Sequence, residues 1–236
     1  MNYMPNTITE MIVDGIQENE EQKQNNWYTF HSNGKHIVCI LINMTNCTSL
    51  QFFFSGIRNM VSISFTSEFN TENVVDMNSM FADCSSLVSI NFSNLNTKNL
   101  KTMEGMFHSC RSLQSIDFSN LDLRNVEIMY KFCYICCSLV SVNFTNTRTL
   151  NLTSYPGMFG YCVNLTSIEL PNFKIRNTDG MFEGCPNLRY FDLRSISCHL
   201  VYDLVYYVSS NGTLIINSNC SDLIPNRFSN WTIIKG

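Results

Sequence analysis

Hydrophobic and polar positions recur in a fixed order, with a period of about 26 residues, through the middle of the chain. Each copy reads Met-Phe-x-x-Cys-x-x-Leu-x-x-Ile-x-Phe, with one degenerate copy, one shortened copy and one weak first copy. The six copies begin at Phe53, Met80, Met106, Phe132, Met158 and Met181. A period of this size is typical of a solenoid, in which each coil contacts only its neighbours. It predicts the fold well and says much less about function.

Two periodicities lie inside each copy. The end of the pattern Leu-x-x-Ile-x-Phe alternates with period 2, which predicts a short strand with Ile90 and Phe92 inward and Ser89 and Asn91 outward. From Leu100 onward, apolar residues are spaced by three to four positions, which predicts a short helix. We therefore expect an α/β repeat solenoid of about six strand–turn–short-helix coils, each of 23–27 residues, whose strands pair into a parallel sheet.

The ends of the chain depart from this period and are predicted to cap the stack at both ends. We expect a loose arm over residues 1–25, an N-terminal cap over 26–52, the solenoid over 53–198 and a C-terminal cap over 199–236. The N-terminal cap is predicted to be a hairpin that turns at Asn33-Gly34. The C-terminal cap is predicted to contain a helix at 199–208, a turn at Asn211-Gly212, and strands at 213–216 and 231–234.

Composition narrows the function classes. Only 14% of residues are charged and 44% are hydrophobic, so the chain is expected to fold and to build its polar surface from Asn, Ser and Thr. The net charge of −4, without a Lys/Arg cluster, argues against a nucleic-acid partner. No apolar run reaches the length of a transmembrane segment. The N-terminus has no basic region followed by an apolar one, so no signal peptide is expected and a cytoplasmic location stays open.

The repeat itself resembles a known family. Residues 81–107 read Phe-x-x-Cys-Ser-Ser-Leu-x-Ser-Ile-x-Phe-Ser-Asn-Leu-x-Thr-x-Asn-Leu-x-x-Met-x-x-Met-Phe, which is similar to the BspA-like leucine-rich repeat family, in the variant first named from mycoplasma surface proteins of unknown function. The resemblance covers about residues 50–198. It implies a leucine-rich-repeat-like solenoid, and a non-enzymatic surface or secreted protein that binds other proteins or cells.

Cysteines and histidines are the candidates for chemistry. One repeat column holds five of the 11 cysteines, Cys84, Cys110, Cys136, Cys162 and Cys185. Because these cysteines are expected to face inward in successive coils, we expect them to act as small buried apolar residues. Disulfide formation or metal binding is the alternative. The Cys133-x-x-Cys136 pair lacks the second pair or fold context of a zinc or redox site. His31, His36, His108 and His199 have no nucleophile or carboxylate in register, so we expect no enzyme and no cofactor.

The outward strand face is the predicted partner-binding surface. Its candidate residues are Ser89, Asn91, Ser115, Asp117, Ser141, Asn143, Ser167, Glu169, Tyr190 and Asp192. Such small polar residues can simply hydrogen-bond from coil to coil, or they can form the extended recognition surface that solenoids provide. Only Tyr190 is typical of an interface hot spot, while Asp117, Glu169 and Asp192 make one half acidic and favour a basic partner or a cation.

Two functional hypotheses follow. The first is a binding module that recognises a protein or glycan ligand at a cell surface, in an adhesion-like role. The second is an intracellular scaffold with the same fold, which the missing leader and the thiol-rich core favour because free thiols suit a reducing compartment.

Overall fold

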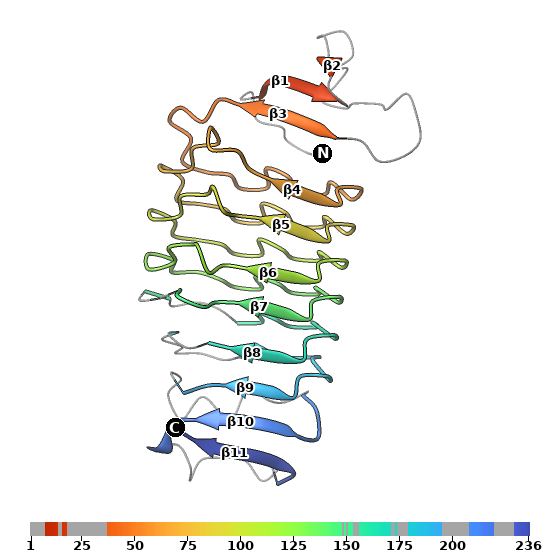
Figure 1. The fold of residues 1–236 in the computed structure, drawn as a ribbon, viewed down its shortest axis with the longest axis vertical. Coiled ribbons are helices and arrows are strands. Elements are labelled where there is room, and N and C mark those ends of the chain that lie inside the picture. The colour runs from red at the N-terminus through yellow and green to blue at the C-terminus, as the bar shows by residue number, and fades with distance from the viewer. Residues whose placement is uncertain are drawn as a thin grey trace.

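The chain folds as an elongated stack of like coils (Figure 1). Six short strands, β4 to β9, follow one another along the stack in chain order, which confirms the predicted repeat solenoid. The computed structural model describes residues 8–13, 16–17, 37–147, 149, 151–152, 156–170, 173, 179–194, 208–219 and 229–236.

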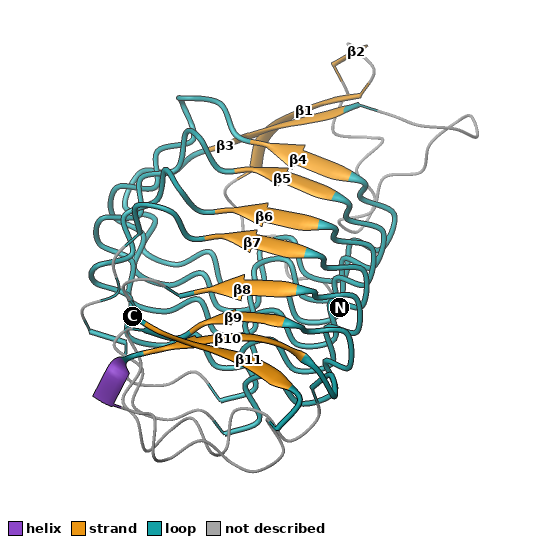
Figure 2. Cartoon of the chain, turned by 60° about the horizontal axis from the view of Figure 1, so that its bottom comes forward, coloured by secondary structure: helices purple, strands orange, loops and turns teal. Residues whose placement is uncertain are grey.

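Each coil contributes one three-residue strand to the same side of the stack (Figure 2). The six strands are β4 (Ser62–Ser64), β5 (Ser89–Asn91), β6 (Ser115–Asp117), β7 (Ser141–Asn143), β8 (Ser167–Glu169) and β9 (Tyr190–Asp192). The strands pair in parallel and in register as β4 with β5, β6 with β7 and β8 with β9, so that Ile63 lies beside Ile90 and Ile116 beside Val142. The middle residue of each strand points into the stack because the alternation of the repeat places an apolar side chain there.

The N-terminal end carries an antiparallel sheet of β1 (Ile8–Val13), β2 (Ile16–Gln17) and β3 (Val38–Ile42), in the order β2-β1-β3. The loose arm predicted for residues 1–25 is therefore wrong where β1 pairs with β3, with Ile12 opposite Cys39. Its pairing partner lies more than 20 residues away, so no local pattern in the arm could reveal it. The predicted hairpin turn at Asn33-Gly34 lies outside the described residues.

At the C-terminal end, β10 (Gly212–Ile216) and β11 (Trp231–Lys235) extend the parallel sheet beyond β9, which confirms the strands expected there. Gly212 is the first residue of β10 and not part of a turn. A Cβ at Gly212 would lie 2.2 Å from the carbonyl oxygen of Arg189 and 2.6 Å from the Trp231 ring, so this close approach requires glycine. Most of the helix expected at 199–208 lies outside the described residues, and the cap boundaries stay a prediction.

The short helix expected in each coil is wrong. Among the described residues the only helical turn is a 3₁₀ turn at 218–219, and the segments opposite the strands are successive tight turns (Figure 2). In these turns alternate N–H groups donate to the next coil, as from Phe81 to Met106 and from Asp83 to His108, both within 2.9 Å. The N–H between them donates back within its own coil, from Ala82 to Ser79 at 3.1 Å.

Left-handed residues produce this alternation. Two positions four residues apart have positive φ in each coil: Phe52 and Gly56, Ser79 and Asp83, Gly105 and Ser109, Lys131 and Ile135, Tyr161 and Gly157, Gly180 and Gly184. A left-handed residue ends an α-helical turn, so no helix can propagate through the segment. The same turns still bring apolar residues inward every three to four positions, as a helix would.

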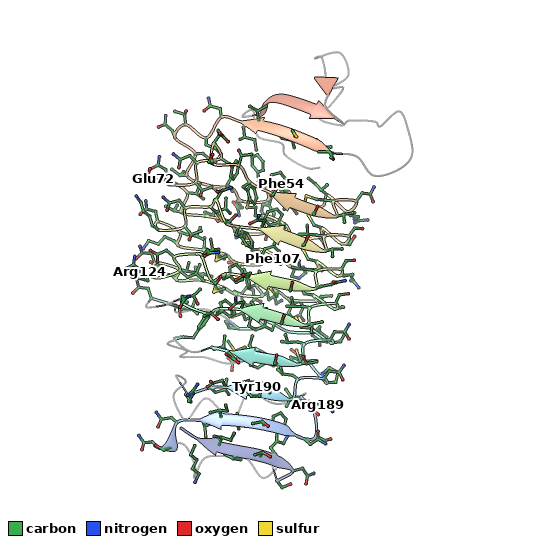
Figure 3. All side chains as sticks on the ribbon, in the orientation of Figure 1. Phe54, Glu72, Phe107, Arg124, Arg189 and Tyr190 are labelled. Atoms are coloured by element: carbon green, nitrogen blue, oxygen red, sulfur yellow. The ribbon has the colours of Figure 1, made fainter. Side chains whose placement is uncertain are left out.

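Ladders of identical side chains fill the interior. The rings of Phe54, Phe81 and Phe107 stack at 5.5 Å between successive centroids, and Phe54 and Phe107 are labelled in Figure 3. Where the degenerate copy replaces the next Phe by Cys133, the ring of Phe132 takes the place and meets Phe107 edge to face at 5.4 Å. Each coil therefore buries its apolar edge against its two neighbours.

The cysteine column is buried, and its thiols are free, which confirms the structural interpretation of these residues. Each thiol lies 3.0–3.1 Å from a backbone carbonyl oxygen of the preceding coil, to which it donates; Cys110, for example, donates to Phe81. Cysteine suits the column because it is small and apolar yet carries a weak donor that the buried carbonyl accepts.

Asparagine makes a third ladder, along one edge of the stack. The side-chain amides of Asn99 and Asn125 donate to the carbonyl oxygens of Glu72 and Lys98 at 2.8 and 2.6 Å. Glu72 lies at this edge in Figure 3. These bonds give exposed turn carbonyls a partner in the next coil, which explains part of the asparagine content.

Candidate binding surfaces

The predicted strand face has the expected orientation. Ser89, Ser115 and Ser141 are exposed at the first position of their strands, while Ile116 and Val142 between the outward positions are buried. Ser167 and Tyr190 continue the column and are half-buried. The face is therefore an accessible row of small hydroxyl groups with one aromatic residue near its C-terminal end.

The second outward column mainly closes turns. One carboxamide or carboxylate oxygen of Asn91, Asp117 and Asn143 accepts the N–H two residues further on, at 2.9 Å in each case. The amide of Asn143 also donates to Asp117 across one coil step at 3.0 Å. The coil-to-coil interpretation holds for Asn143 with Asp117, whereas the bond that all three side chains share is a local one that closes the following turn.

Asp192 differs from its expected outward role. Only 4% of its surface is exposed, and its carboxylate is held by the guanidinium of Arg194, with Nη2 2.5 Å from Oδ2. The hydrogen bonds that Arg194 donates to Asp192, together with the negative charge of that carboxylate, raise the pKa of Arg194. The prediction of three available acidic groups on this face is therefore wrong for Asp192, because Arg194 covers and neutralises it; Glu169 stays exposed.

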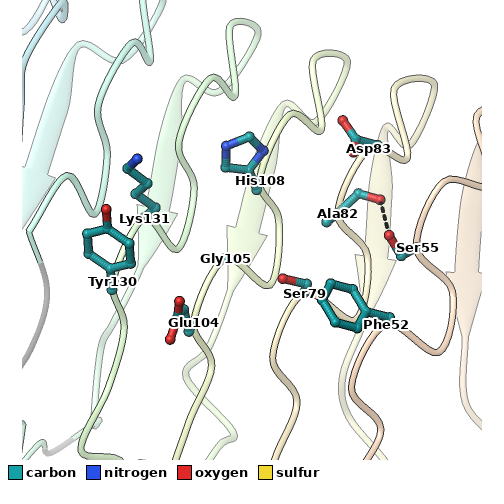
Figure 4. Close-up of a pocket in the computed structure, with 10 residues that line it drawn as sticks. All are labelled: Phe52, Ser55, Ser79, Ala82, Asp83, Glu104, Gly105, His108, Tyr130 and Lys131. Carbon is teal, nitrogen blue, oxygen red and sulfur yellow. Dashed lines mark hydrogen bonds between the residues drawn. The ribbon is translucent and has the colours of Figure 1, made fainter.

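A groove that sequence reasoning missed lies on the turn side of the stack (Figure 4). It is an open hollow of about 260 Å³ that crosses four successive coils. Its lining residues are Phe52, Ser55, Ser79, Ala82, Asp83, Glu104, Gly105, His108, Tyr130 and Lys131. The hollow exists because Ser79, Ala82 and Gly105 are small, whereas Phe52 and Tyr130 are large and lie in the first and last of these coils.

Aromatic side chains continue from the groove toward the C-terminus. The ring centroid of His108 lies 5.5 Å from that of Tyr134, and Tyr134 lies 5.3 Å from Tyr161. The hydroxyl of Tyr161 donates to Glu183 at 2.9 Å. Tyr134 fits there because Gly160 has no Cβ, which would lie 2.7 Å from the Tyr134 ring. We call His108, Tyr134 and Tyr161 the aromatic row.

The charged groups of the groove differ in whether they have a partner within the chain. The ammonium of Lys131 lies 4.9 Å from the Tyr134 ring centroid and 5.2 Å from that of Tyr130. Its hydrogen bond with Tyr130 raises the pKa of Lys131. Among the described residues, the carboxylates of Asp83 and Glu104 form no ion pair. Burial lowers the pKa of His108 below its ordinary value of 6.5, so the imidazole is neutral at pH 7.

The reactive residue types offer little for catalysis. Burial raises the pKa of the Cys84 thiol to about 11 and that of Cys185 to about 12, so neither is a ready nucleophile. Ser109 Oγ lies 3.1 Å from His108 Nδ1, but Ser109 is buried and out of reach of a substrate. Within the described ranges, no three His, Cys, Asp or Glu side chains gather as metal ligands. No helix there is long and apolar enough to span a bilayer.

The signal for the groove was present in the sequence but spread over several columns. His108 and Tyr134 occupy one variable column in adjacent copies, whereas Tyr161 belongs to the next column and reaches them over Gly160. Phe52 precedes the repeat motif altogether. Column-by-column alignment treats such positions as unconstrained, so the cluster emerges only in three dimensions. His31, His36 and His199 lie outside the described residues.

Two family models match the chain. One, described as a Mycoplasma protein of unknown function (DUF285), matches residues 48–173. The other, described as a BspA type leucine rich repeat region, matches residues 154–235. No curated protein and no solved structure matches the chain significantly.

Proposed function

Because the chain belongs to the BspA-type leucine-rich repeat family, in its Mycoplasma variant of unknown function, we propose that it is a recognition module that binds a protein or glycan ligand at a cell surface. Repeat solenoids of this kind are typically non-enzymatic and present extended binding surfaces. The observation that carries the proposal is the groove with its adjoining aromatic row on the turn side of the stack.

The scaffold suits recognition because it is already ordered. The groove-lining turns donate their backbone N–H groups to the next coil, and the interior behind them is a continuous apolar core. Binding there would not carry the entropy cost of ordering the protein surface, so a given buried area gives a higher affinity. Tyr and other aromatic side chains are also the residues most often found at energetic hot spots.

Saturable binding of the labelled, full-length protein to intact cells tests this proposal. Replacing Phe52 and Tyr134 together by serine should weaken binding about tenfold or more, because the double variant loses two aromatic side chains of the kind that form hot spots. The matched control places arginine at Ser115 and Ser141, which obstructs the strand face. Loss of binding only in the control would move the ligand to the strand face, and no saturable binding by the wild-type protein would refute the proposal.

A second candidate is an intracellular scaffold with the same fold. The free thiols of the buried cysteine column favour it, because such thiols are common in reducing compartments. Protease treatment of intact source cells that make the tagged protein separates the two. Cleavage before lysis would support the surface role, whereas full protection until lysis would favour the scaffold.

A further inference from the structure

We propose that the groove receives a short basic segment of a protein partner, in which an Arg or Lys side chain lies next to an apolar one. The inference rests on the proposed recognition function and narrows it to one site and one class of ligand. It follows from the length of the groove, from two carboxylates that form no ion pair among the described residues, and from the position of its apolar residues.

The length of the groove suits an extended peptide. Its lining runs from Phe52 in one coil to Lys131 three coils later. With about 5 Å per coil step, that is roughly 15 Å, the length of about four residues of extended chain. The hollow is open to solvent along this path, with Ser79, Ala82 and Gly105 between its ends (Figure 4).

The charges favour a cation as ligand. Asp83 and Glu104 come from adjacent coils of the groove, and neither carboxylate forms an ion pair within the described part of the chain. Lys131, the one Lys or Arg of the lining, is directed over the rings of Tyr130 and Tyr134. His108 is neutral at pH 7, as its lowered pKa requires. The groove therefore carries two carboxylates and one ammonium, a net charge of −1, and its two carboxylates can be complemented by a guanidinium or ammonium group.

Apolar groups next to these carboxylates complete the site. Phe52 is 53% exposed, and it lines the groove together with Tyr130. A side chain of the partner that covers Phe52 would bury apolar surface while its basic neighbour meets Asp83 or Glu104. The hydroxyl of Ser55, beside these apolar groups, donates to the Ala82 carbonyl at 3.1 Å. That hydroxyl therefore has a partner within the chain and does not need one from a ligand.

A sugar chain fits these observations less well. Carbohydrates stack on exposed faces of aromatic rings, but the rings of His108 and Tyr134 stack on each other at 5.5 Å with an angle of 22°, so each ring covers one face of the other. The Tyr130 and Tyr134 rings are also in contact with the Lys131 ammonium. An oligosaccharide ligand is therefore an outcome of the test and not the proposal.

Fluorescence anisotropy with labelled probes tests the inference on the full-length protein. The basic probe is a six-residue amide, Gly-Arg-Leu-Lys-Leu-Gly. Its acidic counterpart has Glu in place of Arg and Lys, and maltohexaose is the sugar probe. We expect saturable binding of the basic probe alone, with a Kd that rises with salt because exposed charges are screened. Binding of the acidic or sugar probe in preference to the basic one would overturn the inference.

Isosteric variants locate the binding. Asp83→Asn with Glu104→Gln removes both negative charges of the groove and should raise the Kd of the basic probe about tenfold. Glu169→Gln, an exposed carboxylate on the strand face, is the matched control and should leave the Kd within about twofold. An equal effect of both changes, or no effect of the groove variant, would refute the inference. If cell binding survives while the basic probe fails to bind, the recognition function stands and the basic partner does not.

Discussion

Ile135 has a φ of +64°, in the left-handed region where a β-branched side chain is strained. Glycine there should be more stable than alanine by about 1 kcal/mol, because glycine alone lacks the Cβ that clashes in this conformation. At Ser138 in the same coil, where φ is not positive, alanine should be more stable than glycine by about 0.5–1 kcal/mol. Urea unfolding of the four variants measures both differences. The same preference at both positions would contradict the left-handed turn.

The thiol column should resist alkylation in the folded protein. Cys84 and Cys185 are buried and hydrogen-bonded, with pKa values raised to about 11 and about 12, so at pH 8 almost no thiolate is present. Of the cysteines that the structure describes, Cys39 is exposed and should react first. Peptide mapping by mass spectrometry after iodoacetamide treatment, with and without denaturant, checks the order. Modification of Cys84 as fast as Cys39 in the native protein would disprove the buried ladder.

The same raised pKa makes stability depend on alkaline pH. In the unfolded chain Cys84 loses its proton near its ordinary value of 9.0, whereas in the folded protein it keeps it until about 11. Its contribution to stability is therefore complete below pH 9 and is lost as the pH rises through 11. Cys84→Val should make the urea midpoint fall less between pH 8.5 and 11 than it falls in the wild type. Identical slopes in both proteins would mean that the thiol is not buried.

Among the elements, the strands could be predicted from the sequence and the turns could not. The period-2 pattern has one structural meaning, so Ile116 is buried and Ser115 exposed as expected. A spacing of three to four has two meanings, an α-helix or a run of tight turns. Left-handed residues decide between them, and glycine occupies only some of these positions; Lys131 and Ile135 occupy others and conceal the signal.

The candidate site was predictable only in part, for a related reason. The strand face lies in repeat columns, so its orientation could be predicted, but the Asp192–Arg194 pair depends on two side chains meeting and could not. The groove combines Phe52, Glu104 and Tyr130 from three coils at positions that the repeat does not constrain. A repeat pattern describes what the coils share, whereas a binding site is built from what they do not share.

The junction between β9 and β10 depends on Gly212. Gly212→Ala would place a Cβ against the Arg189 backbone and the Trp231 ring, so it should lower the free energy of unfolding by about 3 kcal/mol, the upper end of overpacking costs. Gly236→Ala is the matched control: its Cβ would meet only the flexible Arg194 side chain, at 2.9 Å, and should cost little. Thermal unfolding of both variants measures the contrast. Equal melting temperatures would mean that β10 does not approach Arg189 so closely.

For the whole molecule, the question is how far a change in one coil is felt. Solenoids are stabilised between nearest neighbours, so distant coils can in principle unfold separately. Here one continuous cluster of buried side chains runs from Met44 near the first coil to Trp231 in the last strand. The Phe and Cys ladders cross most of the coil junctions between these ends. We therefore expect the described coils to unfold as one cooperative unit.

Leu113→Ala tests that expectation from the middle of the stack. Leu113 is fully buried, so its truncation should cost about 2–5 kcal/mol, whereas Ser115→Ala on the exposed strand face should cost little. In a Trp27→Phe background, Trp231 fluorescence reports the C-terminal end and far-UV circular dichroism reports the whole chain. Both transitions should shift together in Leu113→Ala, because the cavity weakens a core that the two ends share. A shift in circular dichroism with the Trp231 transition unchanged would mean that the coils unfold independently, and that a ligand in the groove would stabilise only the coils it touches.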